Sequence, residues 1–264
     1  GWVKRQKEIK DPYATRLREG DSVLACLRGS TRATVVFLSN FGTAYTCRFV
    51  DVPASTGYGE PIQKLFKLKD NEVIINAFSL DPRNVGGSIK PKKEGDEPDV
   101  HGVAVTSDGF ALRFSLEPFL EPSTKAGRRY AKPAGDAYVV GVEKYDGDKK
   151  VIIAVTRQAH AMICKVREIN FLAGAGKGVM LIKLQEKKDD RVVGFKLSGG
   201  DRDLLRVETS RGAEQTVSTA KYSLTGRGGK GREVMKTGQF TRIIDEPRKK
   251  DDAGDDVLTA TLDE

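Results

Sequence analysis

The chain has 264 residues, of which 38% are hydrophobic and 31% charged, so it can bury a sizeable core and disorder is not the default expectation. Its formal net charge of +8 is unevenly placed. Residues 245–264 hold three basic and eight acidic side chains, so an acidic tail of −5 follows a body of +13. A basic body favours polyanionic partners, of which nucleic acid is the usual one, although a solvated surface also explains such a charge.

The cysteines and histidines are too few and too scattered for a disulfide framework or a zinc site. Cys26, Cys47 and Cys164 lie far apart without a C-x-x-C pair, and the only histidines are His101 and His160. No apolar run approaches the ~18 residues of a membrane span, and no signal peptide is expected at the start. These features predict a protein of a reducing cytoplasm with no membrane partner.

The first predicted element is half of a hairpin. Residues Gly1, Trp2, Val3, Lys4 and Arg5 read as a second strand without its first. We therefore expect that the chain was cut from something longer. We also expect another segment, such as the C-terminal tail, to cover the incomplete first unit.

Four complete hairpins follow in chain order. Each has a β-branched strand, a turn with polar residues or Gly, and a second strand with basic or aromatic residues. The predicted strand pairs are Val35 to Leu38 with Ala44 to Phe49, Val103 to Val105 with Phe110 to Phe114, Val151 to Val155 with Ala161 to Val166, and Leu204 to Val207 with Glu214 to Val217.

A glycine loop, usually with cations, follows about 17 residues after each of these turns. An Asp or Asn then leads into an apolar strand, at Asp21, Asn71, Asp136 and Asp190, with spacings of 50, 65 and 54 residues. The longest interval contains residues 82–99, which are rich in Pro, Gly, Lys and Glu and predict an exposed insertion loop. The glycine loops are Gly57 to Gly59, Lys125 to Arg129, Gly174 to Gly178 and Gly226 to Gly231.

A period near 50 residues with about four strands per unit predicts an all-β, propeller-like disc of about five four-stranded blades. WD40 repeats are disfavoured because Trp2 is the only tryptophan. Helical repeats are disfavoured because the apolar runs are short and β-rich. We expect one domain over residues 1–244 and an acidic tail over residues 245–264.

The last glycine loop is the most basic. Gly226, Gly228, Gly229 and Gly231 alternate with Arg227, Lys230 and Arg232, so a backbone able to adopt positive φ carries three cations. Such a loop suits contact with phosphate, and the alternative is a flexible turn whose cations are only solvated. Nucleotide-binding motifs are set aside. The G-x-G-x-x-G match lacks its following helix and acid, and the loop of Gly174 to Gly178 lacks the first glycine and the hydroxyl residue of a P-loop.

Several segments together resemble the C-terminal domain of the A subunit of bacterial type IIA topoisomerases, meaning DNA gyrase or topoisomerase IV. The first-blade hairpin is similar to Gly1 to Arg5, and the second-blade turn to Ser39 to Tyr45. The proline-marked connection and glycine loop resemble Val52-Pro53 with Gly59 to Ile62, and the core of the glycine-arginine box resembles Arg227 to Gly231. The resemblance covers nearly all of residues 1–244.

The resemblance implies a β-pinwheel, a disc whose blades exchange a strand with their neighbours and whose basic outer rim binds and bends duplex DNA. It implies a non-catalytic domain that presents DNA to the catalytic core of an ATP-dependent enzyme. It also implies partners in the rest of the A subunit and, through it, the ATPase B subunit. We expect the isolated domain to be monomeric and cytoplasmic, associated with the bacterial nucleoid. We expect neither a cofactor nor a catalytic centre in this chain.

One departure from the family pattern concerns the box. In gyrases it lies in the first-blade loop, but the corresponding residues here, 11–20, have no glycine pair, and the box-like loop lies in the last unit. This argues against gyrase-type wrapping and favours a topoisomerase IV-like or divergent gyrase subunit.

The candidate DNA-binding residues are cations on the glycine loops and hairpin strands, whose expected role is phosphate contact without sequence readout. For each, the alternative is a solvated surface charge. The set comprises the box residues Gly226, Arg227, Gly228, Gly229, Lys230, Gly231 and Arg232, the loop residues Arg128, Arg129, Lys132 and Lys177, and the strand residues Lys4, Arg5, Arg48, Arg113 and Lys165.

Two other classes of protein fit the repeats. A propeller scaffold for an acidic protein would also be basic, and a propeller enzyme would need clustered carboxylates or a metal on the disc face. For the tail, the simplest interpretation is a solvated, disordered end. The alternative hypothesis is that Asp251, Asp252, Asp255 and Asp256 compete with DNA for the basic body.

Overall fold

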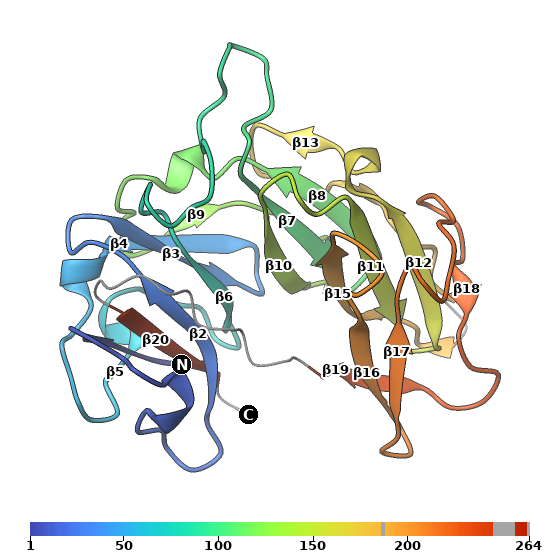
Figure 1. The fold of residues 1–264 in the computed structure, drawn as a ribbon, viewed down its shortest axis with the longest axis horizontal. Helices are drawn as coiled ribbons and strands as arrows, with labels where there is room; N and C mark the ends of the chain where they lie inside the picture. Colours follow the sequence, from blue (N-terminus) through green and yellow to red (C-terminus); the bar gives the residue numbers. More distant parts are fainter. Residues whose placement is uncertain (186–187, 245–256, 263–264) are drawn as a thin grey trace. The chain divides into compact units, whose positions relative to one another are not determined.

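The computed structural model describes residues 1–185, 188–244 and 257–262, and their fold is all-β (Figure 1). Short 3-10 helices connect some of the strands: η1 (Pro12–Ala14), η2 (Phe49–Asp51), η3 (Ile62–Lys64), η4 (Glu117–Phe119) and η5 (Val166–Glu168). The described residues form two compact units. Unit 1 contains residues 1–100, 116–130 and 257–262, and unit 2 contains residues 101–115 and the described part of 131–244.

Unit 1 holds two four-stranded sheets. The first has the order β2-β20-β1-β5, and the second has the order β6-β3-β4-β9. The strands are β1 (Trp2–Gln6), β2 (Ser22–Arg28), β3 (Thr34–Ser39), β4 (Thr43–Arg48), β5 (Glu60–Pro61), β6 (Ile74–Ser79), β9 (Arg128–Arg129) and β20 (Val257–Leu262).

Unit 2 holds three sheets. The third sheet has the order β10-β7-β8-β13, with β14 also on β8; the fourth has the order β15-β11-β12-β18; and the fifth has the order β17-β16-β19. The strands are β7 (His101–Thr106), β8 (Phe110–Phe114), β10 (Val139–Tyr145), β11 (Val151–Thr156), β12 (His160–Lys165), β13 (Phe171–Leu172), β14 (Val179–Met180), β15 (Val192–Ser198), β16 (Leu205–Thr209), β17 (Glu214–Val217), β18 (Arg232–Glu233) and β19 (Phe240–Ile243).

The same four-residue turn closes all four hairpins. In each, the fourth residue has positive φ and donates its N–H to the carbonyl of the first, as Gly42 does to Ser39 at 3.1 Å. The hydroxyl of the first residue accepts the N–H of the residue after the turn, as Ser39 Oγ does from Thr43 at 3.2 Å. The equivalent first residues are Thr106, Thr156 and Thr209. The four predicted hairpins are therefore confirmed, and a local side-chain bond fixes each turn.

The sheets exchange strands through the glycine loops. After each of the last three hairpins, the chain crosses to the second hairpin strand of the preceding sheet: β9 pairs with β4, β14 with β8, and β18 with β12. β5 takes the same place on β1. At each crossing a glycine with positive φ approaches a strand carbonyl, where a Cβ would lie only 2.1 to 2.7 Å from the oxygen. The glycine and oxygen pairs are Gly59 with Val3, Gly127 with Ala44, Gly178 with Ala111, and Gly231 with Ala161.

The last described strand completes the first sheet. β20 lies between β1 and β2 and is antiparallel to both, with Lys4 opposite Thr259 and Cys26 also opposite Thr259. In the second sheet the corresponding place is taken by β3, the first strand of a hairpin. β20 thus supplies the strand that the sequence predicted to be missing. The four acidic residues of the tail hypothesis, Asp251, Asp252, Asp255 and Asp256, lie outside the described residues.

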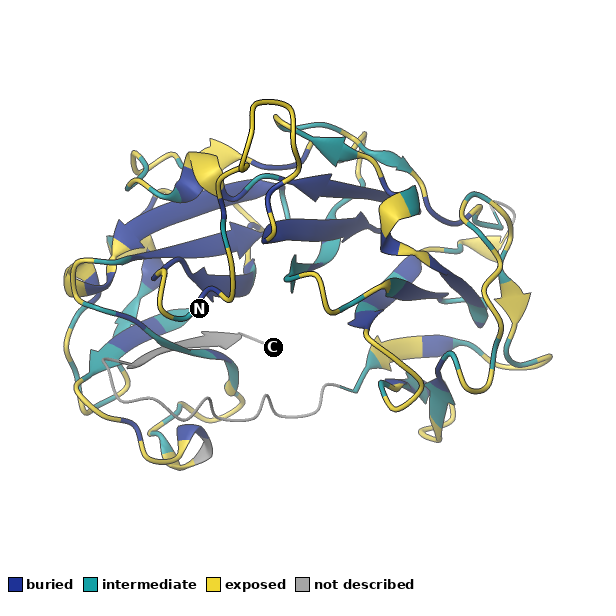
Figure 2. Ribbon diagram, turned by 45° about the horizontal axis from the view of Figure 1, so that its top comes forward, coloured by how far each residue is buried: buried dark blue, intermediate teal, exposed yellow. Residues whose placement is uncertain are grey.

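Apolar side chains between neighbouring sheets of each unit form the core. One cluster joins the first and second sheets of unit 1 and includes Val3, Phe37 and Phe49. Two clusters in unit 2 join the third sheet to the fourth and the fourth to the fifth. Figure 2 accordingly shows the hairpin strands mostly as buried and the connecting loops mostly as exposed.

The stretch of residues 82–99 contains no strand and connects β6 to β7. Val85 and Ile89 are buried, whereas residues 90–97 are exposed. The ends of this stretch are therefore packed and its tip is presented to solvent.

Candidate nucleic-acid interface

The box-like loop, residues 225–232, lies along the fourth sheet and β14 of unit 2. Thr225 N donates to Ile163 O at 2.8 Å, Gly228 N to Leu181 O at 2.7 Å, and Lys183 N to Gly229 O at 2.8 Å. The amide of Gly228 is therefore used within the fold. The positive φ of Gly226, Gly228 and Gly231 lets the loop follow this path.

All three cations of this loop are exposed. Arg227 Nη1 donates to Met180 O at 3.3 Å, and Arg232 Nη2 donates to Ser223 Oγ at 2.6 Å. These bonds use one guanidinium nitrogen of each arginine and hold both exposed side chains against neighbouring segments of the fold. The chemistry available here is charge-assisted hydrogen bonding to an anion.

Three further predicted cations of unit 2 lie on segments that contact one another and the box-like loop. Lys132 N donates to Gly176 O at 2.8 Å, which places Lys132 beside the loop of Lys177. That loop leads into β14, whose Met180 accepts from Arg227. Glu168 accepts from the backbone N–H groups of both Lys165 and Arg227, at 3.0 and 3.3 Å. The fold thus joins four loops that are distant in sequence into one series of contacts.

Carboxylates also occur among these cations. Lys177 Nζ lies 3.8 Å from Asp108 Oδ2 and 3.8 Å from the centroid of the Phe110 ring. The oxygens of Glu168 bond backbone amides in the contacts described above. The carboxylates of Asp108 and Glu168 therefore offset part of the positive charge of the neighbouring cations.

Unit 1 carries a separate group of predicted cations. Arg128 and Arg129 form β9 and are exposed, and Arg128 donates to the carbonyl of Pro118. Arg48 is exposed at the end of β4. Arg5 N donates to Pro53 O at 2.9 Å, which places Arg5 beside the connection that follows Arg48.

Two predicted residues are not surface charges. Lys4 is 2% exposed, and its Nζ donates to Arg16 O at 3.0 Å and Gly57 O at 2.8 Å. Arg113 is 7% exposed, and its Nε donates to Ile169 O at 2.6 Å. Because these side chains hold loops within the fold, the interpretation of Lys4 and Arg113 as phosphate contacts is corrected to a structural role.

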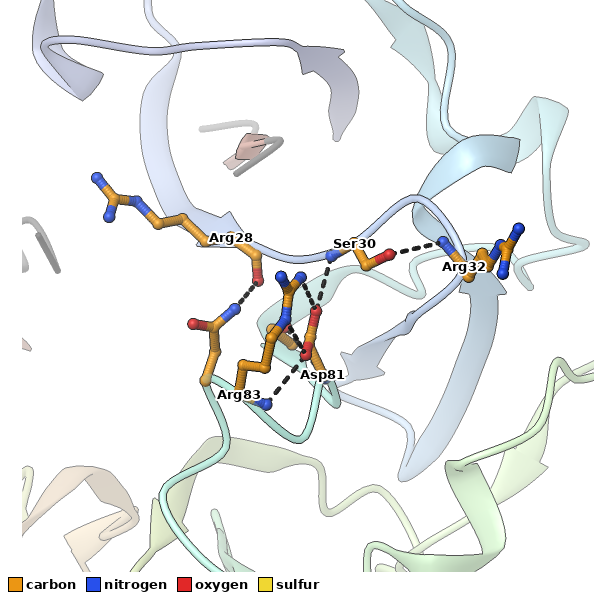
Figure 3. Close-up of polar contacts among 7 residues, drawn as sticks. Arg28, Ser30, Arg32, Asp81 and Arg83 are labelled. Atoms are coloured by element: carbon orange, nitrogen blue, oxygen red, sulfur yellow. Dashed lines mark hydrogen bonds and ion pairs between the residues drawn. The ribbon is translucent and has the colours of Figure 1, made fainter. Parts of the chain in front are cut away.

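Arg83, which is not among the predicted DNA-binding residues, is oriented by a buried acid (Figure 3). The side chain of Asp81 is 3% exposed and accepts Arg83 Nη2 at 2.8 Å, Arg83 Nε at 3.1 Å and Ser30 N at 2.7 Å. These bonds, led by that to the Arg83 side chain, lower the pKa of Asp81 to about 2. In Figure 3 the Arg83 guanidinium folds against Asp81, whereas the side chains of Arg28 and Arg32 point away from it. The available signal was the Asp-Pro-Arg sequence, since an aspartate often accepts the N–H two residues on.

Other kinds of site find little support in the described part of the chain. Within it, no group of His, Cys, Asp and Glu residues is arranged to hold a metal ion. Burial raises the pKa of the Cys47 and Cys164 thiols to about 12, which disfavours a reactive thiolate at either position. Among the described helices, none has the length and apolar character needed to cross a membrane.

The strand-exchanging sheets define the chain as an all-β repeat protein of the propeller type. A family model described as the DNA gyrase C-terminal domain, beta-propeller, matches residues 33–81, 103–144, 152–198 and 216–239. These segments cover more than half of the chain, so the chain belongs to the family of DNA gyrase C-terminal domains. The predicted resemblance and the predicted β-pinwheel fold are both confirmed.

Relatives among characterised proteins are DNA gyrase A subunits. The subunit of Haloquadratum walsbyi is 23% identical over 87% of this chain, and that of Klebsiella oxytoca is 25% identical over 95%. The chain spans only 26% and 33% of those two proteins.

Solved structures give the same fold. The C-terminal domain of DNA topoisomerase IV aligns with a TM-score of 0.75 and 18% identity, over 88% of this chain and 69% of that one. The C-terminal domain of E. coli ParC aligns with a TM-score of 0.70 and 15% identity, over 93% of this chain and 98% of that one.

Proposed function

We propose that this chain binds and bends duplex DNA without reading its sequence, as the C-terminal domain of a type IIA topoisomerase A subunit. In this role it presents DNA segments to a catalytic core elsewhere in the subunit, and through that core it works with the ATPase B subunit. The domain needs no cofactor of its own for this activity. It acts in the bacterial cytoplasm as part of a topoisomerase IV-like or divergent gyrase enzyme.

The observation that carries the proposal is the series of loop contacts in unit 2. It brings together exposed cations that are up to a hundred residues apart, namely Lys132, Lys177, Lys165 and the three cations of the box-like loop. Loops fixed by backbone hydrogen bonds hold these charges in place, so binding an extended polyanion costs little ordering. Cations of this kind contact phosphate oxygens and position DNA without carrying sequence information.

The proposal is tested by titrating the chain with a linear duplex over a range of salt concentrations. Replacing Arg227, Lys230 and Arg232 by alanine removes up to three phosphate contacts. We expect weaker binding and a salt slope that is smaller in magnitude by roughly 3, at about 0.9 per contact. A matched control removes the same charge at exposed positions outside the candidate site, with Lys188→Ala/Arg202→Ala/Arg211→Ala.

Equal effects of the two triple variants would mean that net charge, and not the box-like loop, governs binding. Tighter binding of an acidic protein than of the duplex at matched salt would favour the scaffold alternative. Absence of duplex binding by the unaltered chain would overturn the proposed function itself.

A further inference from the structure

The strand β20 holds two other strands of the first sheet together. It pairs with β1 over four residue pairs and with β2 over six. Among the described strands, β20 is the only one that pairs with β2. Without β20, the sheet would have a slot between β1 and β2 with a strand edge on each side. Such edges readily bind another strand, because their N–H and C=O groups lack hydrogen-bond partners.

The two edges of this slot fix the alignment of the strand that fills it. On β1 the pairing is continuous, and Val3 lies opposite Ala260. On β2 the pairing contains a register shift between Val23 and Ala25. A slip of one residue would turn every side chain to the other face of the sheet and would misplace the bulge. The slot therefore selects a strand in one register.

The centre of the slot suits the sequence of β20. The register places position 260 between Val3 on β1 and Ala25 on β2. Both are buried and belong to the apolar cluster that joins the first and second sheets. A small apolar residue, which the sequence has at 260, suits this position, whereas a bulky or charged residue would overpack the core or bury a charge. The chain's own residues 257–262 are thus a well-matched occupant.

The segment that leads to β20 leaves open which copy of the chain receives the strand. β19 belongs to unit 2 and β20 to unit 1, and residues 245–256 lie between them in the sequence. Nine of these twelve residues are charged, and the others are Pro, Ala and Gly. A tether of this length spans up to about 40 Å and offers no large apolar side chain for packing.

We propose that the slot between β1 and β2 also takes β20 of a second copy of this chain, so that two chains associate by exchanging this strand. The exchange is reciprocal, because each chain offers one strand and one slot. It closes a two-fold symmetric dimer in which both slots are filled. The backbone pairs of β20 are the same in the monomer and the dimer. The protein concentration, relative to the effective concentration of the tethered strand, therefore decides between them.

The register provides a chemical trap for this exchange. Cys26 on β2 lies opposite Thr259 on β20, and residues directly opposite in an antiparallel pair are close enough for a disulfide. The donor chain is Cys26→Ser/Thr259→Cys, and the acceptor is the unaltered chain. A disulfide between position 259 of the donor and Cys26 of the acceptor then requires β20 of one chain to lie in the slot of the other.

The experiment unfolds donor and acceptor together in urea, refolds them at increasing protein concentration and then oxidises them. We expect a covalent heterodimer whose yield rises with concentration, with the linked positions identified by peptide mass mapping. The control donor Cys26→Ser/Ala260→Cys carries its thiol one residue away, on the opposite face of the strand. It is expected to give roughly tenfold less heterodimer.

A single variant, Thr259→Cys with Cys26 retained, verifies refolding and register. At low protein concentration it is expected to form the disulfide within one chain. If this internal disulfide forms but no heterodimer appears at any concentration, strand exchange is overturned. Equal heterodimer from the two donors would indicate random contact between thiols and would also overturn it. Absence of the internal disulfide would overturn the placement of β20 and the exchange with it.

This inference concerns association between chains and does not depend on the proposed binding of DNA. The disulfide yields are measured without DNA, so their failure leaves the proposed function untouched.

Discussion

Gly231 illustrates why single residues of the glycine loops are required. It has a φ of +72°, and a Cβ at this position would lie 2.6 Å from Ala161 O on the neighbouring strand. The same geometry occurs at Gly59, Gly127 and Gly178, so these glycines serve the crossing of the chain between sheets. Gly228 differs, because its φ is +85° but the nearest atom to its Cβ would be 3.9 Å away.

This contrast gives a matched pair of substitutions. Gly228→Ala is expected to cost about 1 to 2 kcal/mol of unfolding free energy, from the left-handed backbone alone. Gly231→Ala is expected to cost more, because the added methyl also meets the Ala161 carbonyl. Urea unfolding of both variants measures the difference. Equal destabilisation would contradict a role of Gly231 in the strand crossing.

Asp81 gives a prediction for the pH dependence of stability. Its pKa is lowered from the ordinary value of 3.8 to about 2, so its contribution is present above pH ~4 and is lost as the pH falls towards 2. Asp81→Asn is expected to destabilise the chain by about 2 kcal/mol at neutral pH, because it weakens several bonds to a buried carboxylate. Unfolding measured from pH 7 downward is expected to show the gap between the two proteins closing below pH 4. A gap that stays constant to pH 2 would contradict this account.

Among single residues, the sequence predicted those of the four hairpin turns, because a turn depends on local pattern. The burial of Lys4 and Arg113 could not be predicted from local pattern. Both lie on strands next to basic or apolar neighbours, and the loops that cover them come from elsewhere in the chain. Alternation along a strand indicates two faces but does not tell which face a distant loop covers.

Strand exchange dominates at the scale of elements. The hairpins β3–β4, β7–β8, β11–β12 and β16–β17 were predicted because their partners are adjacent in sequence. The exchanged strands β5, β9 and β18 have two residues each, which is too short for a period-2 pattern to identify them. The sequence predicted an incomplete first unit but could not fix the register of β20, because pairing across some 250 residues leaves no local signal.

The role of β20 predicts what truncation does. Ending the chain after residue 256 removes the strand between β1 and β2, leaving both with unpaired edges. Amide exchange on β1 and β2 is expected to accelerate at least tenfold, whereas β11 and β12 in unit 2 keep their protection. Unchanged protection of β1 and β2 would contradict the structural role of β20.

Because β20 belongs to the first sheet, the hypothesis that the acidic tail competes with DNA cannot be tested by deleting the tail. A deletion of residues 246–264 removes β20 together with the acids, so it mixes two effects. Replacing Asp251, Asp252, Asp255 and Asp256 by Asn keeps β20 and is expected to tighten duplex binding at low salt if the acids compete with DNA. Unchanged affinity would remove that hypothesis.

For the molecule as a whole, the net charge and the family membership both favour the proposed binding of a polyanion. A body of +13 precedes the acidic tail, and the chain belongs to the family of DNA gyrase C-terminal domains. Membership followed from the sequence because the repeats and the box-like loop are local patterns. The sequence could not predict which cations lie together. Their grouping depends on contacts between loops of different repeats in unit 2.

The position of the box-like loop predicts the topological outcome of binding. Because it lies in the last repeat and not in the first, we expect bending without strong chiral wrapping. Ligation of nicked circular DNA in the presence of the chain is expected to leave the mean linking number nearly unchanged. A large shift would show that the chain wraps DNA with a defined hand.

In the proposed function, several fixed cations contact phosphates of duplex DNA irrespective of its sequence. The most direct measurement is the dependence of the binding constant on salt for two linear duplexes of unrelated sequence and equal length. With six to eight phosphate contacts, a plot of log K against log salt is expected to have a slope of about −5 to −7 for both duplexes. A slope near zero, or affinities that differ greatly between the two sequences, would contradict the claim.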